Sequence, residues 1–409
     1  MDPSKVTALS MDCPTESQFD VPVQQRSARD PVKSLEKPKK WQSKITGVMV
    51  AGLGMLAFAT RAGLGSGSNL SCTALYLSLL LMVAEGRVLG NKFHLLVDGT
   101  AADNKNNELI FFLAWLVATD VFDEASFFCM IVGHTFTRLD QSFRTLIVKL
   151  LSEAVWTVTS LLVFIRKFLE PYGCIEVREL HAYWDFKTWF QPYVHQRFSG
   201  FATGQYGSGM HEFLLRKGAD GQVRLLVRKS SRASGWMPEG EGYLVFKETP
   251  KGQPPLAPGK ADHAWNKEVV VATVKSWFRL MDVGTSQLAR VKSDWEARFA
   301  SLPPNGDTNK LAEHLKPVWL PLPKRVDHAI GSSGALQSAI RNFSVLDNPS
   351  VNPVTGHGRT EGDVEYEREA LKRRMRSLDS LCIYQGDYLF VKTPAGASAH
   401  SLPTQTLVL

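Results

Sequence analysis

The sequence predicts an α+β protein with an N-terminal bundle of about four transmembrane helices, followed by a soluble α+β domain that holds a small antiparallel sheet. Three observations support this fold class. Four apolar runs crowd into residues 45–168, the composition becomes an ordinary polar and apolar mixture after Leu169, and a hairpin pattern begins at His211. The expected domains are a disordered basic tail (1–44), the transmembrane region (45–168), the α+β domain (170–345) and a C-terminal part (346–409).

The composition bounds these alternatives. The 409 residues are 44% hydrophobic and 21% charged, which excludes wholesale disorder and a collagen-like fibre. Lys and Arg outnumber Asp and Glu by 47 to 40, a surplus that suits an anionic membrane surface or nucleic acid but also occurs in ordinary basic proteins. The five cysteines form no C-x-x-C pair, so no disulfide framework or zinc ribbon is expected.

The first 44 residues contain five prolines among polar residues and show no sustained apolar period, which predicts the disordered tail. Seven basic residues against two acidic ones lie within residues 26–44, directly before the first apolar run. Basic residues before a first span favour a cytoplasmic N-terminus, and the loop charges fit four crossings with both termini cytoplasmic.

The apolar runs are residues 45–60, 70–84, 109–119 and 146–165. Crossing a bilayer takes about 20 mostly apolar residues, so each run needs flanking residues to complete a span. Runs of this length also occur as buried helices of water-soluble proteins. We favour the membrane interpretation because four runs follow one another within about 120 residues.

Charged residues inside this region are expected to pair between helices or to mark interfaces rather than to line a pathway. They are Asp120, Asp123, Glu124, His134, Asp140, Lys149 and Glu153. Gly47, Gly52 and Gly54 would leave a small-residue face on the first span, which indicates close helix packing and self-association in the membrane.

After Leu169 the pattern changes to strands and amphipathic helices. Residues 211–217 and 222–228 flank an Asp-Gly turn and predict a β-hairpin. Further strands are expected at 242–248 and 268–274, and an amphipathic helix at 286–300. Beyond these we expect a helix at 335–343, a linker at 347–359, a charged helix at 363–378, a short hairpin at 381–391 and a frayed end.

Basic residues on and after the hairpin are the candidate binding residues. Fixed positive charge beside small serine hydroxyls suits phosphate groups, of anionic lipid or of RNA. A solvated strand face that blocks edge-to-edge pairing would give the same pattern. The candidates are Arg216, Arg224, Arg228, Lys229 and Arg232. The sequence indicates no catalytic constellation, metal-ligand set, cofactor motif or small-molecule substrate.

Residues 37–168 resemble the small four-span virion membrane proteins of certain insect and plant RNA viruses. The resemblance rests on the basic cluster Lys37, Lys39, Lys40 and Lys44, the four hydrophobic segments, the polar break at 120–124 and the pair Gly133-His134. It implies a structural protein of membranes without enzymatic activity. The 240 residues after Leu169 depart from such compact proteins.

Together these observations predict a polytopic membrane protein of structural or scaffolding type, whose basic cytoplasmic domain contacts anionic lipid, RNA or a protein. The alternative is a membrane-bound enzyme, or a degenerate remnant of one, whose soluble domain binds a phosphate-bearing ligand. A small transporter is a third hypothesis, disfavoured by the few spans and by the lack of an internal repeat.

Overall fold

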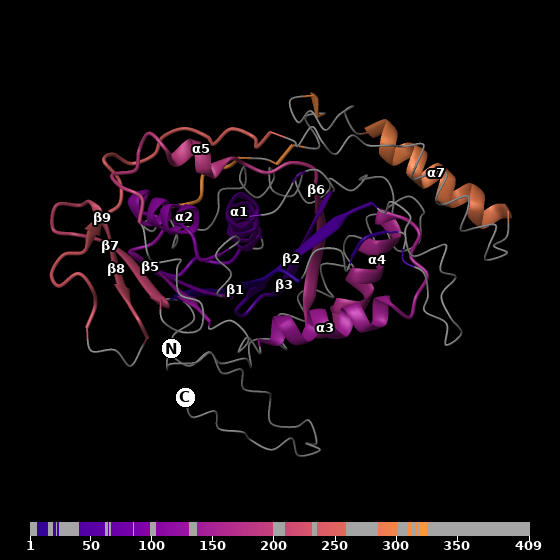
Figure 1. The fold of residues 1–409 in the computed structure, drawn as a ribbon, viewed down its shortest axis with the longest axis horizontal. Helices are drawn as coiled ribbons and strands as arrows, with labels where there is room; N and C mark the ends of the chain where they lie inside the picture. The colour runs from indigo at the N-terminus through magenta and orange to yellow at the C-terminus, as the bar shows by residue number, and fades with distance from the viewer. Residues whose placement is uncertain are drawn as a thin grey trace, which may run out of the picture.

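The computed structural model describes residues 6–14, 19–21, 23, 41–61, 64, 67–84, 86–98, 104–130, 137–198, 209–230, 235–258, 285–301, 310–311, 316–317 and 319–324 of the chain. Within them a nine-stranded sheet has the order β6-β3-β2-β1-β4-β5-β7-β8-β9 (Figure 1). Its strands are β1 (Val6–Asp12), β2 (Ser43–Val50), β3 (Gly54–Arg61), β4 (Lys92–Val97), β5 (Glu124–Cys129), β6 (Cys174–Leu180), β7 (Glu212–Lys217), β8 (Val223–Arg228) and β9 (Tyr243–Leu244).

The strands pair differently on the two sides of β1. Strands β1, β2 and β3 form an antiparallel meander, whereas β4 is parallel to β1 and β5 is parallel to β4. At one end β6 is parallel to β3, and at the other β7, β8 and β9 continue the sheet in antiparallel fashion. The chain therefore leaves β1 toward one side of the sheet and later returns to build its other side.

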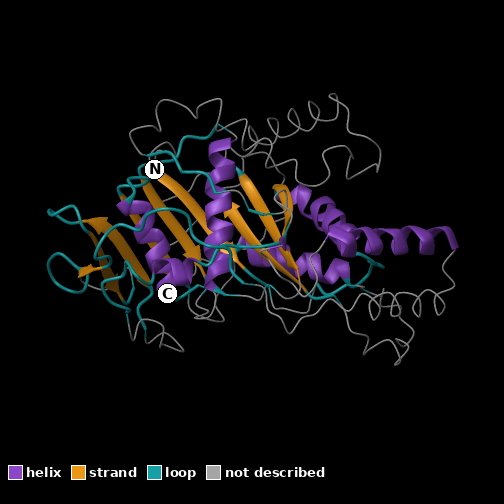
Figure 2. Ribbon diagram, turned by 90° about the horizontal axis from the view of Figure 1, so that it is seen from above, coloured by secondary structure: helices purple, strands orange, loops and turns teal. Residues whose placement is uncertain are grey.

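Helices cover both faces of the sheet (Figures 1 and 2). Helices α1, α2 and α5 share one hydrophobic core with the sheet, and α3, α4 and α7 share a second core on the opposite face. The helices are α1 (Ser68–Ala84), α2 (Asn107–Ala118), α3 (Arg138–Leu150), α4 (Val158–Leu169), the 3-10 helix η2 (Glu170–Tyr172), α5 (Phe186–Phe190) and α7 (Thr285–Ser301).

Protein side chains surround the most apolar helix, α1. Tyr76, at its centre, is fully buried; its ring stacks on that of Trp319 with centroids 4.4 Å apart, and its hydroxyl donates to the carbonyl of Leu320. A helix that is apolar on all sides is buried either in lipid or in the core of a large protein. Helix α1 is buried in the core of the protein, and its apolar composition reflects contacts with other side chains on every side.

The predicted four-helix transmembrane bundle is wrong. Among the residues that the structure describes, no helix combines the length and the apolar character needed to cross a membrane. The run at 45–60 forms the β2–β3 hairpin. The run at 109–119 forms α2, whose 12 residues span only about 18 Å. The fourth run is divided between α3 and α4.

The membrane-based conclusions are overturned with the bundle: the multi-pass localisation with both termini cytoplasmic, the scaffolding role in a membrane, and the membrane-bound enzyme. The physical reason is that strands buried on both faces, like β2 and β3, read as continuous apolar runs without alternation. Gly47, Gly52 and Gly54 lie in this hairpin rather than on a transmembrane helix, so their predicted helix-packing role is also wrong.

The remaining predicted strands and helices agree with the structure to different extents. Strand β1 forms within the segment assigned to the tail. The predicted hairpin forms as β7 and β8, but it extends the large sheet through β5 instead of building a small one. The strand expected at 242–248 is reduced to β9, and the helix expected at 286–300 corresponds to α7. The elements expected at 268–274, at 335–343 and after residue 346 lie outside the described residues.

Candidate functional site

Two aspartates lie at the carboxyl ends of the two central parallel strands. Asp12 is the last residue of β1, and Asp98 directly follows β4. Because β1 and β4 are parallel neighbours, their carboxyl ends meet at one edge of the sheet. The connections leaving these strands diverge to opposite sides, which is the arrangement that leaves a ligand-binding crevice in open α/β sheets.

Helix α3 brings a third carboxylate to the same edge, because it follows β5, which runs parallel to β4. Thr137 caps this helix, and Asp140 in its first turn completes a capping box. One Asp140 oxygen accepts hydrogen bonds from the Thr137 backbone N–H at 2.9 Å and hydroxyl at 2.7 Å. The Asp140 carboxyl is also hydrogen-bonded to the carboxyl of Asp12.

Gly47 permits this contact between α3 and the sheet. It is the β2 register partner of Asp12, and α3 packs directly above it. A Cβ atom at Gly47 would lie 2.5 Å from Cζ of Phe143 and 2.9 Å from Cδ1 of Leu139. The missing side chain therefore sets the height of α3 above the sheet, and with it the distance between Asp140 and Asp12.

The three carboxylates interact electrostatically. The pKa of Asp12 is raised from 3.8 to about 7, mainly by burial and then by the charge and hydrogen bond of Asp140, with a smaller contribution from the charge of Asp98. A backbone hydrogen bond from Cys13 opposes this rise. Like charges held this close favour a shared proton between Asp12 and Asp140.

Asp98 contacts residues that lie directly before α2. The Asn104 amide donates to the Asp98 carboxylate at 2.5 Å, and the Ser71 hydroxyl of α1 donates to the Asn104 carbonyl at 3.4 Å. Asn106 caps α2 by accepting from the Leu109 backbone N–H at 3.0 Å. These contacts fix the orientation of Asp98 relative to both helices on that face.

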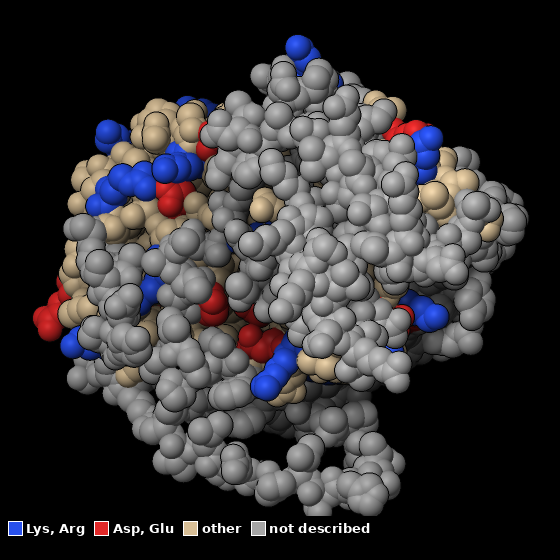
Figure 3. Space-filling view, turned by 45° about the vertical axis from the view of Figure 1, so that its right-hand side comes forward, with Lys and Arg blue, Asp and Glu red and all other residues tan. Residues whose placement is uncertain are grey.

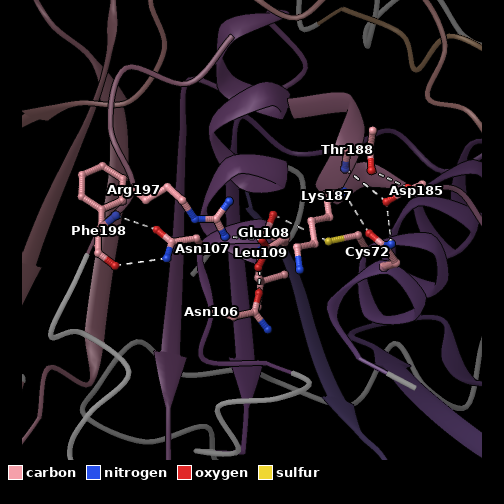
Figure 4. Close-up of polar contacts among 11 residues, drawn as sticks. Cys72, Asn106, Asn107, Glu108, Leu109, Asp185, Lys187, Thr188, Arg197 and Phe198 are labelled. Carbon is pink, nitrogen blue, oxygen red and sulfur yellow. Dashed lines mark hydrogen bonds and ion pairs between the residues drawn. The ribbon is translucent and has the colours of Figure 1, made fainter. Parts of the chain in front are cut away.

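Figure 4 shows how the segment around residues 185–198 holds the start of α2. The Asn107 amide exchanges two hydrogen bonds with the backbone of Phe198, at 2.8 and 3.1 Å. Glu108, only 6% exposed, is paired with Arg197 at 2.5 Å.

The start of α1 is held by the same segment. The Asn69 amide donates to Asp185 at 2.9 Å, and its carbonyl accepts from the Lys187 backbone N–H at 3.0 Å. The first turns of α1 and α2 are thereby fixed next to the carboxyl edge of the sheet.

Lys105 is a buried basic residue next to Asn104, the residue that donates to Asp98. It is only 3% exposed, and burial lowers the pKa of its ammonium group. The Cys129 thiol at the end of β5 interacts with the charges of both Lys105 and Asp98. Burial is the main cause that raises the pKa of Cys129 to about 12, so this thiol is unreactive near neutral pH.

Three carboxylates from three elements supply the oxygen donors that hard divalent cations such as Mg²⁺ prefer. In the described part of the chain, no group of three His, Cys, Asp or Glu side chains meets the geometry of an assembled metal site. This agrees with the contacts above, in which Asp98 is turned to Asn104 while Asp12 and Asp140 bond to each other.

The structure separates the basic residues predicted from the sequence. Arg216 and Arg224 face each other at the edge of the sheet far from Asp98, and Arg224 pairs with Asp220 at 2.7 Å and Glu241 at 3.0 Å. Arg232 lies outside the described residues.

Arg228 and Lys229 lie at the same edge of the sheet as the three aspartates. Arg228 is the register partner of Glu212 in β7, and Glu212 is the register partner of Phe128 near the carboxyl end of β5. Arg228 pairs with Glu212 and stacks 4.4 Å above the Trp236 ring, while Lys229 is exposed. On the described part of the face drawn in Figure 3, basic and acidic side chains are both present, and several of the basic ones gather at the upper left.

Sequence reasoning missed the carboxylates. Asp12 lies in the predicted tail, Asp140 counts among the charged residues of the predicted membrane region, and Asp98 is not among the candidates. The usable signal is that two short apolar segments, residues 6–11 and 93–97, each end directly in aspartate. That pattern is typical of strands whose carboxyl ends carry functional side chains.

A profile of the family described as "Domain of unknown function (DUF7869)" matches residues 33–233, just under half of the chain. The match includes Asp98 and Asp140 but not Asp12. No curated protein and no solved structure matches the chain.

Proposed function

We propose that this chain is a divalent-metal-dependent enzyme of phosphodiester chemistry on nucleic acid, of the nuclease or strand-transfer type, in which Asp12, Asp98 and Asp140 bind the metal. The observation that carries the proposal is the convergence of three carboxylates, from β1, β4 and α3, on the crevice where the strand order reverses.

The chemistry of these residues suits a divalent cation, although the three carboxylates are not assembled around one point in the described structure. Asp12 and Asp140 face each other without a described cationic partner, and burial together with the charge of Asp140 raises the pKa of Asp12. A divalent ion would replace the shared proton and relieve the repulsion. When bound, such ions polarise a phosphoryl oxygen, activate the attacking oxygen and stabilise the leaving oxygen.

The topology supports the same chemistry. Strands β3-β2-β1-β4-β5, with β2 alone antiparallel to the other four and helices after β3, β4 and β5, have the order of the ribonuclease H-like architecture. That architecture serves nucleases and strand-transfer enzymes. Because a fold hosts many functions, this likeness supports the proposal by analogy, and the carboxylates remain its main support.

Each carboxylate is held by its own element. Asp12 is fixed at the end of a central strand, Asp140 in a capped first helical turn, and Asp98 through Asn104. Loss of the proton shared by Asp12 and Asp140 would free carboxylate oxygen atoms of both residues to act as ligands, while one Asp140 oxygen stays hydrogen-bonded to Thr137. In the reaction an oxygen of water or of a 3′ hydroxyl forms a bond to phosphorus, the bond to the leaving oxygen breaks, and that oxygen takes up a proton. No oxidant or reductant is needed.

The test is cleavage or joining of labelled DNA and RNA oligonucleotides by the full chain with Mg²⁺ or Mn²⁺. We expect Asp12→Asn, Asp98→Asn and Asp140→Asn each to lower the rate by at least about 100-fold, since each removes a charged metal ligand. Glu239→Gln is the matched control, because it changes an exposed carboxylate in the loop before β9, the edge strand of the sheet on the side away from β1.

Product analysis separates hydrolysis from strand transfer. The proposal fails if the wild-type chain processes neither DNA nor RNA with either metal. It also fails if the activity survives all three aspartate substitutions.

A further inference from the structure

Lys105 differs from its neighbours in having no hydrogen-bond or ion-pair partner among the residues that the structure describes. The other four residues of segment 104–108 use their polar side chains in the contacts described above, with Asp98, Leu109, Phe198 and Arg197. Lys105 forms no hydrogen bond or ion pair with any described residue, although it is only 3% exposed. A lysine whose side chain is enclosed in this way without a described counter-charge is costly, so its retention calls for an explanation.

The position of Lys105 suggests an explanation for its retention. Asn104, its neighbour, contacts Asp98 directly. On the other side, Cys129 interacts with the charges of both Lys105 and Asp98, and Cys129 is the register partner of Val97, the residue before Asp98. Lys105 thus follows the residue that contacts Asp98, and its charge acts on Cys129 at the carboxyl end of β5.

We propose that Lys105 binds a phosphate group of the nucleic acid as it lies in the carboxylate crevice. This inference rests on the proposed function and adds the contact that holds the substrate. A lysine is a compact point charge that binds phosphate well, and a phosphate would supply the anion that the described protein does not. The bound phosphate would be the one at, or next to, the reacting bond.

Lys105→Met tests this, because it keeps the length of the side chain and removes the charge. The measurement is the affinity of the full chain for a single-stranded oligonucleotide with Ca²⁺, over a range of salt concentrations. We expect affinity to fall by about 10- to 100-fold, as for the loss of one charge-assisted hydrogen bond. The slope of log affinity against log salt should fall by about one.

Stability distinguishes a binding role from a structural one. Lys105→Met should raise the melting temperature, because it removes an unpaired buried charge, while it weakens binding. Lys105→Arg should restore part of the affinity. Lys92→Met is the control, since Lys92 is exposed, paired with Glu124 and located at the opposite end of β4; its affinity should match that of wild type.

An unchanged affinity and salt slope in Lys105→Met would overturn the inference, as would a loss of affinity that parallels a loss of stability. Failure of the proposed function looks different. If the wild-type chain never cleaves or joins nucleic acid but Lys105→Met still loses affinity and one unit of salt slope, the phosphate contact stands and the catalytic proposal falls.

Discussion

Burial and repulsion from nearby carboxylates both raise the pKa of Asp12. Its carboxyl is hydrogen-bonded to Asp140 and lies within the field of Asp98. In the unfolded chain its pKa returns to the ordinary value of about 3.8. Between that value and about 7, the folded chain retains a proton that the unfolded chain releases.

The free energy of unfolding should therefore fall as the pH rises from about 4 to about 7 in the presence of a chelator. One retained proton gives a slope on the order of 1 kcal/mol per pH unit at most. Urea unfolding of wild type and Asp12→Asn at several pH values measures it. We expect a flatter profile in Asp12→Asn and an unchanged one in Glu239→Gln; identical slopes in wild type and Asp12→Asn would contradict the coupling.

At the scale of elements, α3 and its contact with β2 determine whether the carboxylates meet. Phe143 and Leu139 lie against the bare Cα of Gly47, and both side chains are nearly fully buried, so neither can swing into solvent. Over-packing of such a contact displaces the helix.

Gly47→Ala should lower the free energy of unfolding by about 1–3 kcal/mol and reduce phosphodiester activity more than stability alone explains, because Asp140 moves with α3. Phe143→Leu in the same chain should restore part of both by making room. Gly52→Ala is a useful comparison: it lies in the β2–β3 turn at φ +73 with open space around it, so it strains only the backbone. Equal losses of activity in the Gly47 and Gly52 variants would argue against the positioning role.

The sequence predicted the locations of several elements better than their surroundings. The runs at 70–84 and 109–119 correspond closely to α1 and α2, and the hairpin around residues 218–221 formed as expected. The run at 45–60 was misassigned because strands buried on both faces lack the two-residue alternation of an exposed sheet. Local pattern alone does not distinguish a helix buried in lipid from one buried in protein.

At the scale of the whole molecule, the candidate site depends on pairings between distant segments. Asp12 and Asp98 come together because β1 pairs with β4, and Asp140 joins them only once β5 and α3 are in place. Strand order is a tertiary property that no local pattern encodes. The aspartates that end two apolar segments could be recognised in the sequence, but not their convergence.

The central claim is that three carboxylates form one divalent-cation site, and a titration with Mn²⁺ tests it most directly. Electron paramagnetic resonance of the full chain, with and without Asp12→Asn, Asp98→Asn and Asp140→Asn, counts the bound ions. We expect wild type to bind Mn²⁺ with a matching rise in melting temperature, and each variant to lose both. Mn²⁺ binding that is absent from the wild-type chain, or that is retained equally in all three variants, would contradict the account.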